Sequence, residues 1–282
     1  MQGSSPKSPE SLVDLSTLSP AAVPARLALL HAELGAGAGA ELVLAGGLSE
    51  QFVRDLCAGG GFELIRLSRR PGAGEVQRGR VGAGKGPGPG ASAGAGGGPG
   101  AGEGPGPGGA WRVTCTQQRT LPDFVGPDMR VLVCGLNPSL VAADAGFGFA
   151  TPSNRFWRAA ADAGLITVPR APLESLRVDG VGMTDMVKRA TARSHHLDRA
   201  EYVAGAERVR RLVSWLSPAV VVFVGLEGWR AAVDRRAVVG WQPEAFAGAP
   251  AYVMPSTSGA NAHARLVDLT AHLAGVVAGA AG

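Results

Sequence analysis

The sequence predicts an α/β protein in which a short central parallel sheet lies between layers of helices, preceded by a small N-terminal α/β region. Continuous apolar runs at 130–134, 219–224 and 251–254 are typical of strands buried on both faces. Segments with helical apolar spacing alternate with these runs, which is the pattern of a parallel sheet. A stretch made almost entirely of Gly, Ala and Pro, at 71–110, separates this part from the N-terminal region.

The stretch at 71–110 predicts a disordered linker, because its residues cannot bury enough apolar surface to offset the entropy of ordering them. We therefore expect three parts: an N-terminal region of unknown role at 1–70, the linker, and a larger domain at 111–282. The larger domain is long enough to bury a substantial core by itself, whereas the N-terminal region is marginal in size.

Alternating patterns in the N-terminal region predict a small α/β unit. We expect helices at 22–34 and 49–57, strands at 41–44 and 62–67, and a further strand supplied after the linker by 111–116. No residue pattern in this region indicates a chemical activity.

The larger domain begins with the strand at 130–134, which runs into a turn at Gly135-Leu136-Asn137-Pro138. The next elements, in chain order, are helices at 154–163 and 198–216, a strand at 219–224, a helix at 226–234, a strand at 251–254 and a closing helix at 261–277. In a parallel sheet the ligand lies beyond the carboxyl ends of the strands. Because the two turn motifs follow the first and last strands, we expect them to share one ligand site.

Composition limits the classes of protein and of partner that the sequence can represent. Lys plus Arg number 27 and Asp plus Glu 23, which gives a formal net charge of +4 and a pI of about 9.3. A basic balance suits a nucleic-acid partner without establishing one. The three cysteines are widely spaced and odd in number, which argues against a disulfide framework. No apolar stretch is long enough to span a bilayer and no secretory signal is evident, so we expect a soluble cytoplasmic protein with no membrane partner.

Two loops carry the candidate chemistry. The first is Gly135-Leu136-Asn137-Pro138-Ser139-Leu140, followed by GFGFA at 146–150 and SNRFW at 153–157. The second is the serine-rich MPSTSG at 254–259. An Asn side chain both donates and accepts, so Asn137 can hold a water or a substrate carbonyl, although it is no strong base. Taken alone, an Asn-Pro pair is more typical of a residue that caps a turn.

Together these segments resemble the mismatch-specific uracil and thymine DNA glycosylases of the uracil-DNA glycosylase superfamily. The matching segments are GLNPSL at 135–140, GFGFATPSNRFW at 146–157 and MPSTSG at 254–259, with a weaker match in GMTDMVKRAT at 182–191. The resemblance implies the three-layer α/β sandwich of that superfamily. It also implies a monofunctional enzyme that hydrolyses the N-glycosidic bond of uracil in mismatched DNA and so initiates base excision repair. Thymine and modified cytosine are further candidate substrates.

The resemblance also implies roles for residues of the first loop. Asn137 would position the water that attacks the deoxyribose carbon, and Asn in place of the Asp of faster relatives predicts slower chemistry. Phe149 would stack on the flipped base, and the backbone around Gly135, Leu136 and Asn137 would contact its polar edge. Base flipping is needed because the glycosidic carbon is inaccessible within a duplex. The alternative for Phe149 is a core aromatic residue.

The second loop would bind DNA phosphates near the start of the final helix, through Ser256, Thr257, Ser258 and Gly259. Arg155 either contacts a phosphate or forms a structural ion pair. The family pattern places a Leu or Arg wedge soon after this loop, and the sequence here has Gly259-Ala260-Asn261-Ala262-His263 instead. Either Asn261 or His263 takes the place of the wedge, or the enzyme holds the flipped base less firmly.

Other charged residues have simpler interpretations. We read Lys188 and Arg189 as surface or phosphate-facing charges rather than as a Schiff-base lysine. The arginines Arg208, Arg210 and Arg211 indicate the solvated face of a helix. Adjacent His195 and His196 do not share a face and have no evident third ligand, so we expect a solvated loop, no metal and no cofactor.

The expected partner is double-stranded DNA with G·U or G·T mispairs, and downstream repair enzymes are further candidates. We expect a monomer, associated with the nucleoid if the protein is bacterial. One competing hypothesis is a non-catalytic reader of uracil-containing or damaged DNA. A nucleotide-binding protein that uses the glycine-rich loop at 146–149 is another, but it would lack a P-loop lysine. A scaffold role for the N-terminal region is a third.

Overall fold

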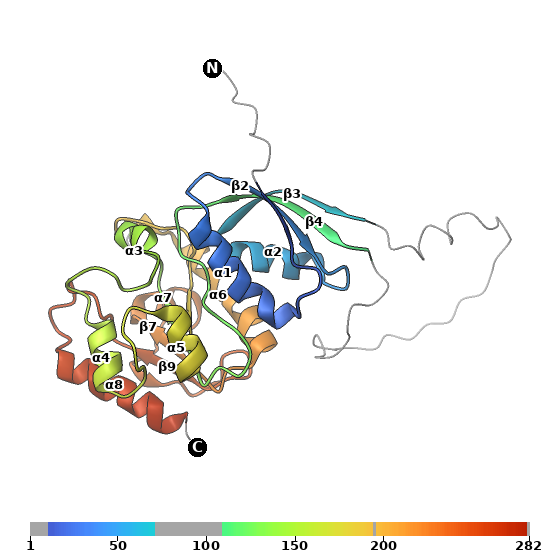
Figure 1. Cartoon of the computed structure of the whole chain (residues 1–282). Coiled ribbons are helices and arrows are strands. Elements are labelled where there is room, and N and C mark those ends of the chain that lie inside the picture. Colours follow the sequence, from blue (N-terminus) through green and yellow to red (C-terminus); the bar gives the residue numbers. More distant parts are fainter. Residues whose placement is uncertain (1–10, 71–108, 194–195, 281–282) are drawn as a thin grey trace, which may run out of the picture.

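The computed structural model describes residues 11–70, 109–193 and 196–280, and nearly all of the predicted linker lies outside these ranges. The described residues form two sheets; one hydrophobic cluster packs on the first sheet and two pack on the second (Figure 1). The first is a four-stranded sheet of order β1-β2-β4-β3, and the second is a five-stranded sheet of order β6-β5-β7-β9-β8.

The first sheet carries two helices and forms the N-terminal unit. Its elements are β1 (Ser11–Asp14), the 3-10 turn η1 (Pro20–Ala22), α1 (Val23–Glu33), β2 (Gly39–Leu44), α2 (Glu50–Gly59), β3 (Phe62–Arg69) and β4 (Trp111–Gln117). All five predicted elements are present, and β1 is an addition. Ser49 starts α2, because its hydroxyl accepts a hydrogen bond of 3.2 Å from the Phe52 amide.

Strand β4 closes the N-terminal unit although it follows the long gap in the described chain. It lies between β2 and β3 and runs antiparallel to both. The predicted domain boundary at residue 111 assigned these residues to the larger domain. The structure places 111–117 in the first sheet instead, because the main-chain groups of β4 pair there on both sides.

The second unit is the predicted α/β sandwich. Its elements are β5 (Val131–Gly135), α3 (Leu140–Ala145), α4 (Phe156–Asp162), α5 (Pro172–Asp179), β6 (Val181–Asp185), α6 (Arg199–Leu216), β7 (Val220–Val224), α7 (Leu226–Ala232), β8 (Gly240–Trp241), β9 (Ala251–Met254) and α8 (Leu266–Gly279). Strands β6, β5, β7 and β9 are parallel, and the short β8 is antiparallel at the edge. The predicted fold class is confirmed.

Alternate residues of the central strands point to opposite faces of the second sheet, and both faces are covered. On one side Val131, Val133 and Val222 belong to the cluster that includes α4 and α8. On the other side Leu132 and Phe223 belong to the cluster that includes α6 and α7. Burial on both faces explains why β5 and β7 are continuous apolar runs in the sequence.

Two features of the second unit differ from the sequence-based expectation. Strand β6 was not predicted, because Gly182, Thr184 and Asp185 interrupt its apolar character. The closing helix α8 begins at Leu266 rather than near Asn261. The residues before it form a loop, in which the Asn261 side chain donates 2.9 Å to the Ser256 carbonyl.

Helix α6 joins the two units. The rings of Phe52 on α2 and Trp215 on α6 meet edge to face at 4.5 Å, and Arg211 pairs with Asp55 at 2.6 Å. Arg208 is only 8% exposed and pairs with Asp123 at 2.6 Å. The prediction of a solvated arginine face is therefore wrong for Arg208, because the N-terminal unit and the segment after it cover this side of the helix.

Arg210, the third arginine of that helix, lies over the Phe246 ring with its guanidinium carbon 4.4 Å from the ring centroid. The three cysteines are free and buried, and burial raises the pKa of Cys57 and Cys115 to about 12. Among the described helices, none combines the length and apolar character needed to cross a membrane.

The central strand β5 should be the most sensitive part of the larger core. Leu132 is fully buried, so Leu132→Ala should lower the free energy of unfolding by about 2–5 kcal/mol through lost contacts and a residual cavity. Urea unfolding followed by circular dichroism measures this loss. Leu12→Ala, at a leucine that is 63% exposed, is the control and should change stability by less than about 0.5 kcal/mol. Equal losses for the two variants would contradict this core assignment.

Candidate active site

The loops that the sequence singled out meet at the carboxyl edge of the second sheet. Strands β5, β6 and β9 end at Gly135, Asp185 and Met254, and the first two residues are direct neighbours in the sheet register. The loop after β5 holds Asn137, and the loop after β9 is the serine-rich motif. The structure thus brings the two motifs to one edge, as their positions after parallel strands predicted.

The amide of Asn137 is held in one orientation. Its Nδ2 donates to the Thr191 hydroxyl at 2.8 Å, to the Arg189 carbonyl at 3.0 Å and to the Pro138 carbonyl at 3.1 Å. The Thr191 hydroxyl donates its own proton to the Arg193 carbonyl at 3.0 Å, so it acts as an acceptor toward Asn137. Within the described chain no donor reaches Oδ1 of Asn137. This oxygen is therefore left to accept from a water or a substrate N–H.

Asn137 does not cap the helix that follows it. Ser139 performs that function, because its hydroxyl accepts a hydrogen bond of 3.1 Å from the Ala142 amide at the start of α3. Ser139 rather than Asn137 therefore caps α3, and the alternative of Asn137 as a residue that caps its turn stays a prediction.

The loop after β6 runs beside the Asn137 loop. The amides of Met186, Val187 and Thr191 donate to the carbonyls of Gly135, Leu136 and Pro138, at 2.9, 3.0 and 3.1 Å. These bonds hold the first motif beside the loop after β6. The contact that we expect from this backbone to the polar edge of a base stays a prediction.

Gly135, the last residue of β5, lies next to both the Asp185 carboxyl group and the Phe149 ring. A Cβ atom at this position would collide with the Asp185 carboxyl group and lie 3.5 Å from Cζ of Phe149. Only glycine leaves room for the carboxyl group and the ring to approach the end of β5 this closely. The glycine of the motif is thus explained by a close approach.

Phe149 is half-buried and has a φ of +58°, in the left-handed region that bulky residues rarely adopt. Its ring stacks on the fully buried Phe156 with centroids 4.1 Å apart and an interplanar angle of 24°. Strained backbone of this kind is typical of functional sites. The ring packs against the core and is still partly accessible, so its role in base stacking stays a prediction.

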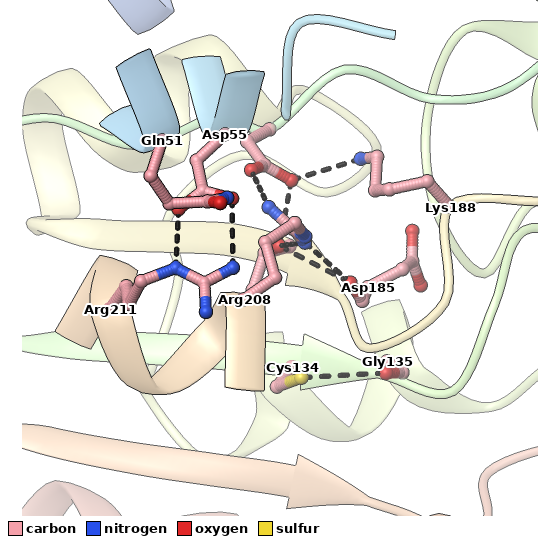
Figure 2. Close-up of polar contacts among 10 residues, drawn as sticks. Gln51, Asp55, Cys134, Gly135, Asp185, Lys188, Arg208 and Arg211 are labelled. Atoms are coloured by element: carbon pink, nitrogen blue, oxygen red, sulfur yellow. Dashed lines mark hydrogen bonds and ion pairs between the residues drawn. The ribbon is translucent and has the colours of Figure 1, made fainter. Parts of the chain in front are cut away.

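Asp185 is a site residue that the sequence analysis missed. Figure 2 shows its carboxyl group pointing away from the neighbouring ion pairs, while its main-chain oxygen accepts a 2.8 Å bond from Arg208. No hydrogen bond from the described residues reaches the carboxyl group. Loss of solvation raises the pKa of Asp185 to about 6, although the Lys188 cation opposes the shift. The sequence signal that could have identified Asp185 was its position as the acidic residue of the weakly matching segment GMTDMVKRAT at 182–191.

Arg155 ties the first motif to the second. Its guanidinium donates to the carbonyls of Ser258 at 2.7 Å, Asn261 at 2.9 Å and Ala264, and its main-chain amide donates to Thr257 at 3.0 Å. These contacts shape the serine-rich loop, so Arg155 has a structural role through carbonyl oxygens rather than through an ion pair. A phosphate contact from Arg155 stays a prediction.

Two expectations for the serine-rich loop need correction. Thr257 is only 1% exposed, so its hydroxyl cannot reach a phosphate unless the loop moves. The loop also does not lie at a helix start, because α8 begins at Leu266. Ser256 and Ser258 are half-buried and Gly259 is exposed, so these three remain the candidates for phosphate contact.

The two residues that could take the place of the wedge, Asn261 and His263, differ in exposure and in hydrogen bonding. Asn261 is half-buried and its side chain is tied to the Ser256 carbonyl. His263 is exposed, and no hydrogen bond to its side chain comes from residues that the structure describes. His263 is therefore the better placed of the two to enter a duplex.

The sequence analysis interpreted Lys188 as a surface or phosphate-facing charge, whereas the structure pairs it with a buried carboxylate. Its Nζ lies 2.9 Å from Asp123, and its side chain is only 13% exposed because the segment after β4 covers it. Arg189 is half exposed and donates twice to Glu201, at 2.7 and 2.8 Å. This bond lowers the pKa of Glu201 to about 2.

His195 lies outside the described residues, and within them no group of three or more His, Cys, Asp or Glu side chains is arranged for a metal ion.

The fold is that of an α/β protein, and it places the two candidate motifs at the carboxyl edge of a parallel sheet. The sequence model of the uracil DNA glycosylase superfamily matches residues 122–276, more than half of the chain, and the protein therefore belongs to this superfamily. A solution structure from Methanosarcina acetivorans, of a protein named as a candidate uracil DNA glycosylase, is 20% identical, with a TM-score of 0.38. That similarity covers 56% of this chain and 98% of the other.

The environment of Asp185 predicts an unusual titration. Its side-chain carbon resonance, assigned by its loss in Asp185→Asn, should titrate near pH 6 rather than near the ordinary value of 3.8. Because the pKa is raised in the folded state, the carboxyl group contributes stability at low pH that is lost as pH rises toward 6. Asp185→Asn should therefore gain stability over wild type above pH 6 and gain little below pH 4. A midpoint at or below 4 would show that the group is solvated.

Proposed function

We propose that this protein is a monofunctional DNA glycosylase that removes uracil from mismatched DNA, with thymine and modified cytosine as further candidate substrates. Membership of the superfamily supports a DNA glycosylase role. The observation that carries the proposal is the Asn137 amide, whose nitrogen is anchored by three acceptors and whose oxygen is left for a water.

The reaction needs a water held beside the deoxyribose carbon rather than a strong base. As the bond from that carbon to the base breaks, its electron pair leaves with uracil and the sugar becomes oxocarbenium-like. Oδ1 of Asn137 accepts a hydrogen bond from the water, whose oxygen then bonds to the sugar and whose proton is released to solvent. A neutral amide acts here by orientation, which by itself lowers the barrier substantially.

The remaining groups would hold the flipped nucleotide. The partly accessible ring of Phe149, supported from behind by Phe156, offers a stacking surface for a planar base. Ser256, Ser258 and Gly259 offer hydroxyl and main-chain groups to phosphates. A G·U or G·T mispair is cheaper to open than a Watson–Crick pair, so mispaired bases would enter the site more readily.

Asp185 would face the base edge, because its carboxyl group lies beside Gly135 and Phe149 and has no protein partner among the described residues. A protonated carboxyl group can donate to a uracil oxygen and accept from the N3–H group. An ionised one repels the negative charge that develops on departing uracil. The charged groups around it are Lys188, Arg208 and Asp123, and the two cations are already paired with Asp123.

Asn137→Ala should reduce the single-turnover rate of uracil excision from a G·U duplex by about 100-fold or more, because the attacking water loses its position. The assay is strand cleavage by alkali after incubation, since a monofunctional enzyme leaves an intact abasic strand. Gln51→Ala, which removes an exposed amide on α2 far along the chain from the site loops, is the control and should keep the wild-type rate.

Two outcomes would contradict this assignment. An unchanged rate in Asn137→Ala would remove Asn137 from the chemistry. Tight binding to G·U duplexes with no excision of uracil or thymine by folded wild-type protein would instead favour the non-catalytic reader. The absence of a large side chain between Gly259 and Ala262 is the observation that favours that alternative.

Asp185→Asn should change the pH dependence of excision. In wild type the single-turnover rate should fall as pH rises through about 6, because the ionised carboxylate disfavours a departing anion. An Asn side chain stays neutral, so the variant should lack this decline and exceed the wild-type rate at pH 8. Rates measured from pH 5 to 8.5 on one G·U duplex decide the matter, and a decline of the same size in both proteins would exclude Asp185 as its source.

A further inference from the structure

We propose that the N-terminal unit positions the catalytic amide, and that Thr120 transmits this effect through the main chain of Lys188 to Asn137. The proposal rests on the proposed role of Asn137. It gives the N-terminal unit a function in the reaction, although the superfamily match begins only at residue 122.

In the first step, hydrogen bonds from the N-terminal unit hold the segment that follows β4. The Gln118 amide donates to the Gly61 carbonyl at 2.9 Å, and the Asp123 amide donates to the Gly59 carbonyl at 2.6 Å. The contact is close, because a Cβ atom on Gly59 would lie 2.6 Å from the Asp123 carboxylate. The end of α2 and the turn after it therefore fix the course of residues 118–123.

The second step links this segment to the loop after β6. The Thr120 hydroxyl donates to the Lys188 carbonyl, and Asp123 accepts from Lys188 Nζ at 2.9 Å. Both Thr120 and Asp123 are buried, with 4% and 3% of their surface exposed. Lys188 is thus held at its carbonyl and at its side chain by two residues of the same segment.

The Asp123 carboxylate also binds Arg208 and Thr184, each at 2.6 Å. Burial alone would raise the pKa of Asp123, but the Arg208 and Lys188 cations hold it below its ordinary value. The carboxylate therefore stays charged, and the Lys188 side chain keeps its partner at neutral pH.

The third step reaches the catalytic amide. The carbonyl that follows Lys188, on Arg189, accepts from Asn137 Nδ2, and so does the Thr191 hydroxyl two residues later. A rotation of the Arg189–Ala190 peptide would withdraw an acceptor from Asn137 and let its amide turn. The hydrogen bond from Thr120 opposes this rotation, because it fixes the carbonyl of the preceding residue.

The test is Thr120→Val in the full chain, which replaces the hydroxyl with a methyl group of similar size. We expect the single-turnover rate on a G·U duplex to fall by about tenfold, since small misplacements of a catalytic group are costly. Thr120→Ser keeps the hydroxyl and should retain the wild-type rate. Thr114→Val, on β4 shortly before this segment, is the control and should also retain it, and thermal unfolding checks that each variant is folded.

A double-mutant cycle separates positioning from general destabilisation. If Thr120 acts through Asn137, Thr120→Val should cause no further loss in an Asn137→Ala background. Independent losses that multiply would overturn the proposal, and so would a wild-type rate in Thr120→Val.

A second readout does not depend on excision. The side-chain amide protons of Asn137, assigned in NMR spectra by their loss in Asn137→Ala, should exchange with solvent several-fold faster in Thr120→Val than in Thr114→Val. Unchanged exchange would overturn the proposal even if the protein excised no uracil. Faster exchange without any excision would support the positioning contact and reject the proposed function instead.

Discussion

The buried carboxylate of Asp123 is the interaction on which the arrangement of the two units depends. It lies between β6, α6 and the loop that carries Lys188, and it accepts from Thr184, Arg208 and Lys188. A buried ion network of this kind adds little net stability, since desolvation offsets much of the attraction. It does impose one geometry, because an unpaired charge in the same place would be costly. The second unit therefore docks on the N-terminal unit in a single register.

The register of the strands within the second sheet determines which groups meet at its edge. Parallel pairing sets Gly135 opposite Asp185, so a residue without a side chain lies beside a carboxyl group. Phe149 fills the remaining space by adopting a left-handed backbone conformation. Each of the three residues is unfavourable by itself. Gly135 is flexible in the unfolded chain, Asp185 is desolvated, and Phe149 has a strained backbone. Their coincidence at one strand end is the physical reason to place the chemistry there.

The sequence predicted elements whose patterns are local and missed relations that are not. Strands β5, β7 and β9 are recognisable because both of their faces are buried, whereas β6 carries Gly182 and Thr184 and gives no such run. Arg208 resembles a solvated helix residue because nothing in α6 itself shows that another unit covers it. The motif identified Asn137, but two of its three acceptors lie 52 and 54 residues further along the chain, on a loop that no periodicity reveals.

The same acceptors explain why residue 137 is an amide. An Asp at this position would turn a carboxylate oxygen toward the carbonyls of Pro138 and Arg189, where only lone pairs would face one another. The Thr191 hydroxyl could not donate to this carboxylate, because its proton is already donated to the Arg193 carbonyl. An Asn shares its two N–H groups among these three acceptors and still presents an oxygen to water. The surrounding main chain thus selects a neutral, weakly basic group, and in the proposed reaction the position of the water would depend on how firmly that group is held.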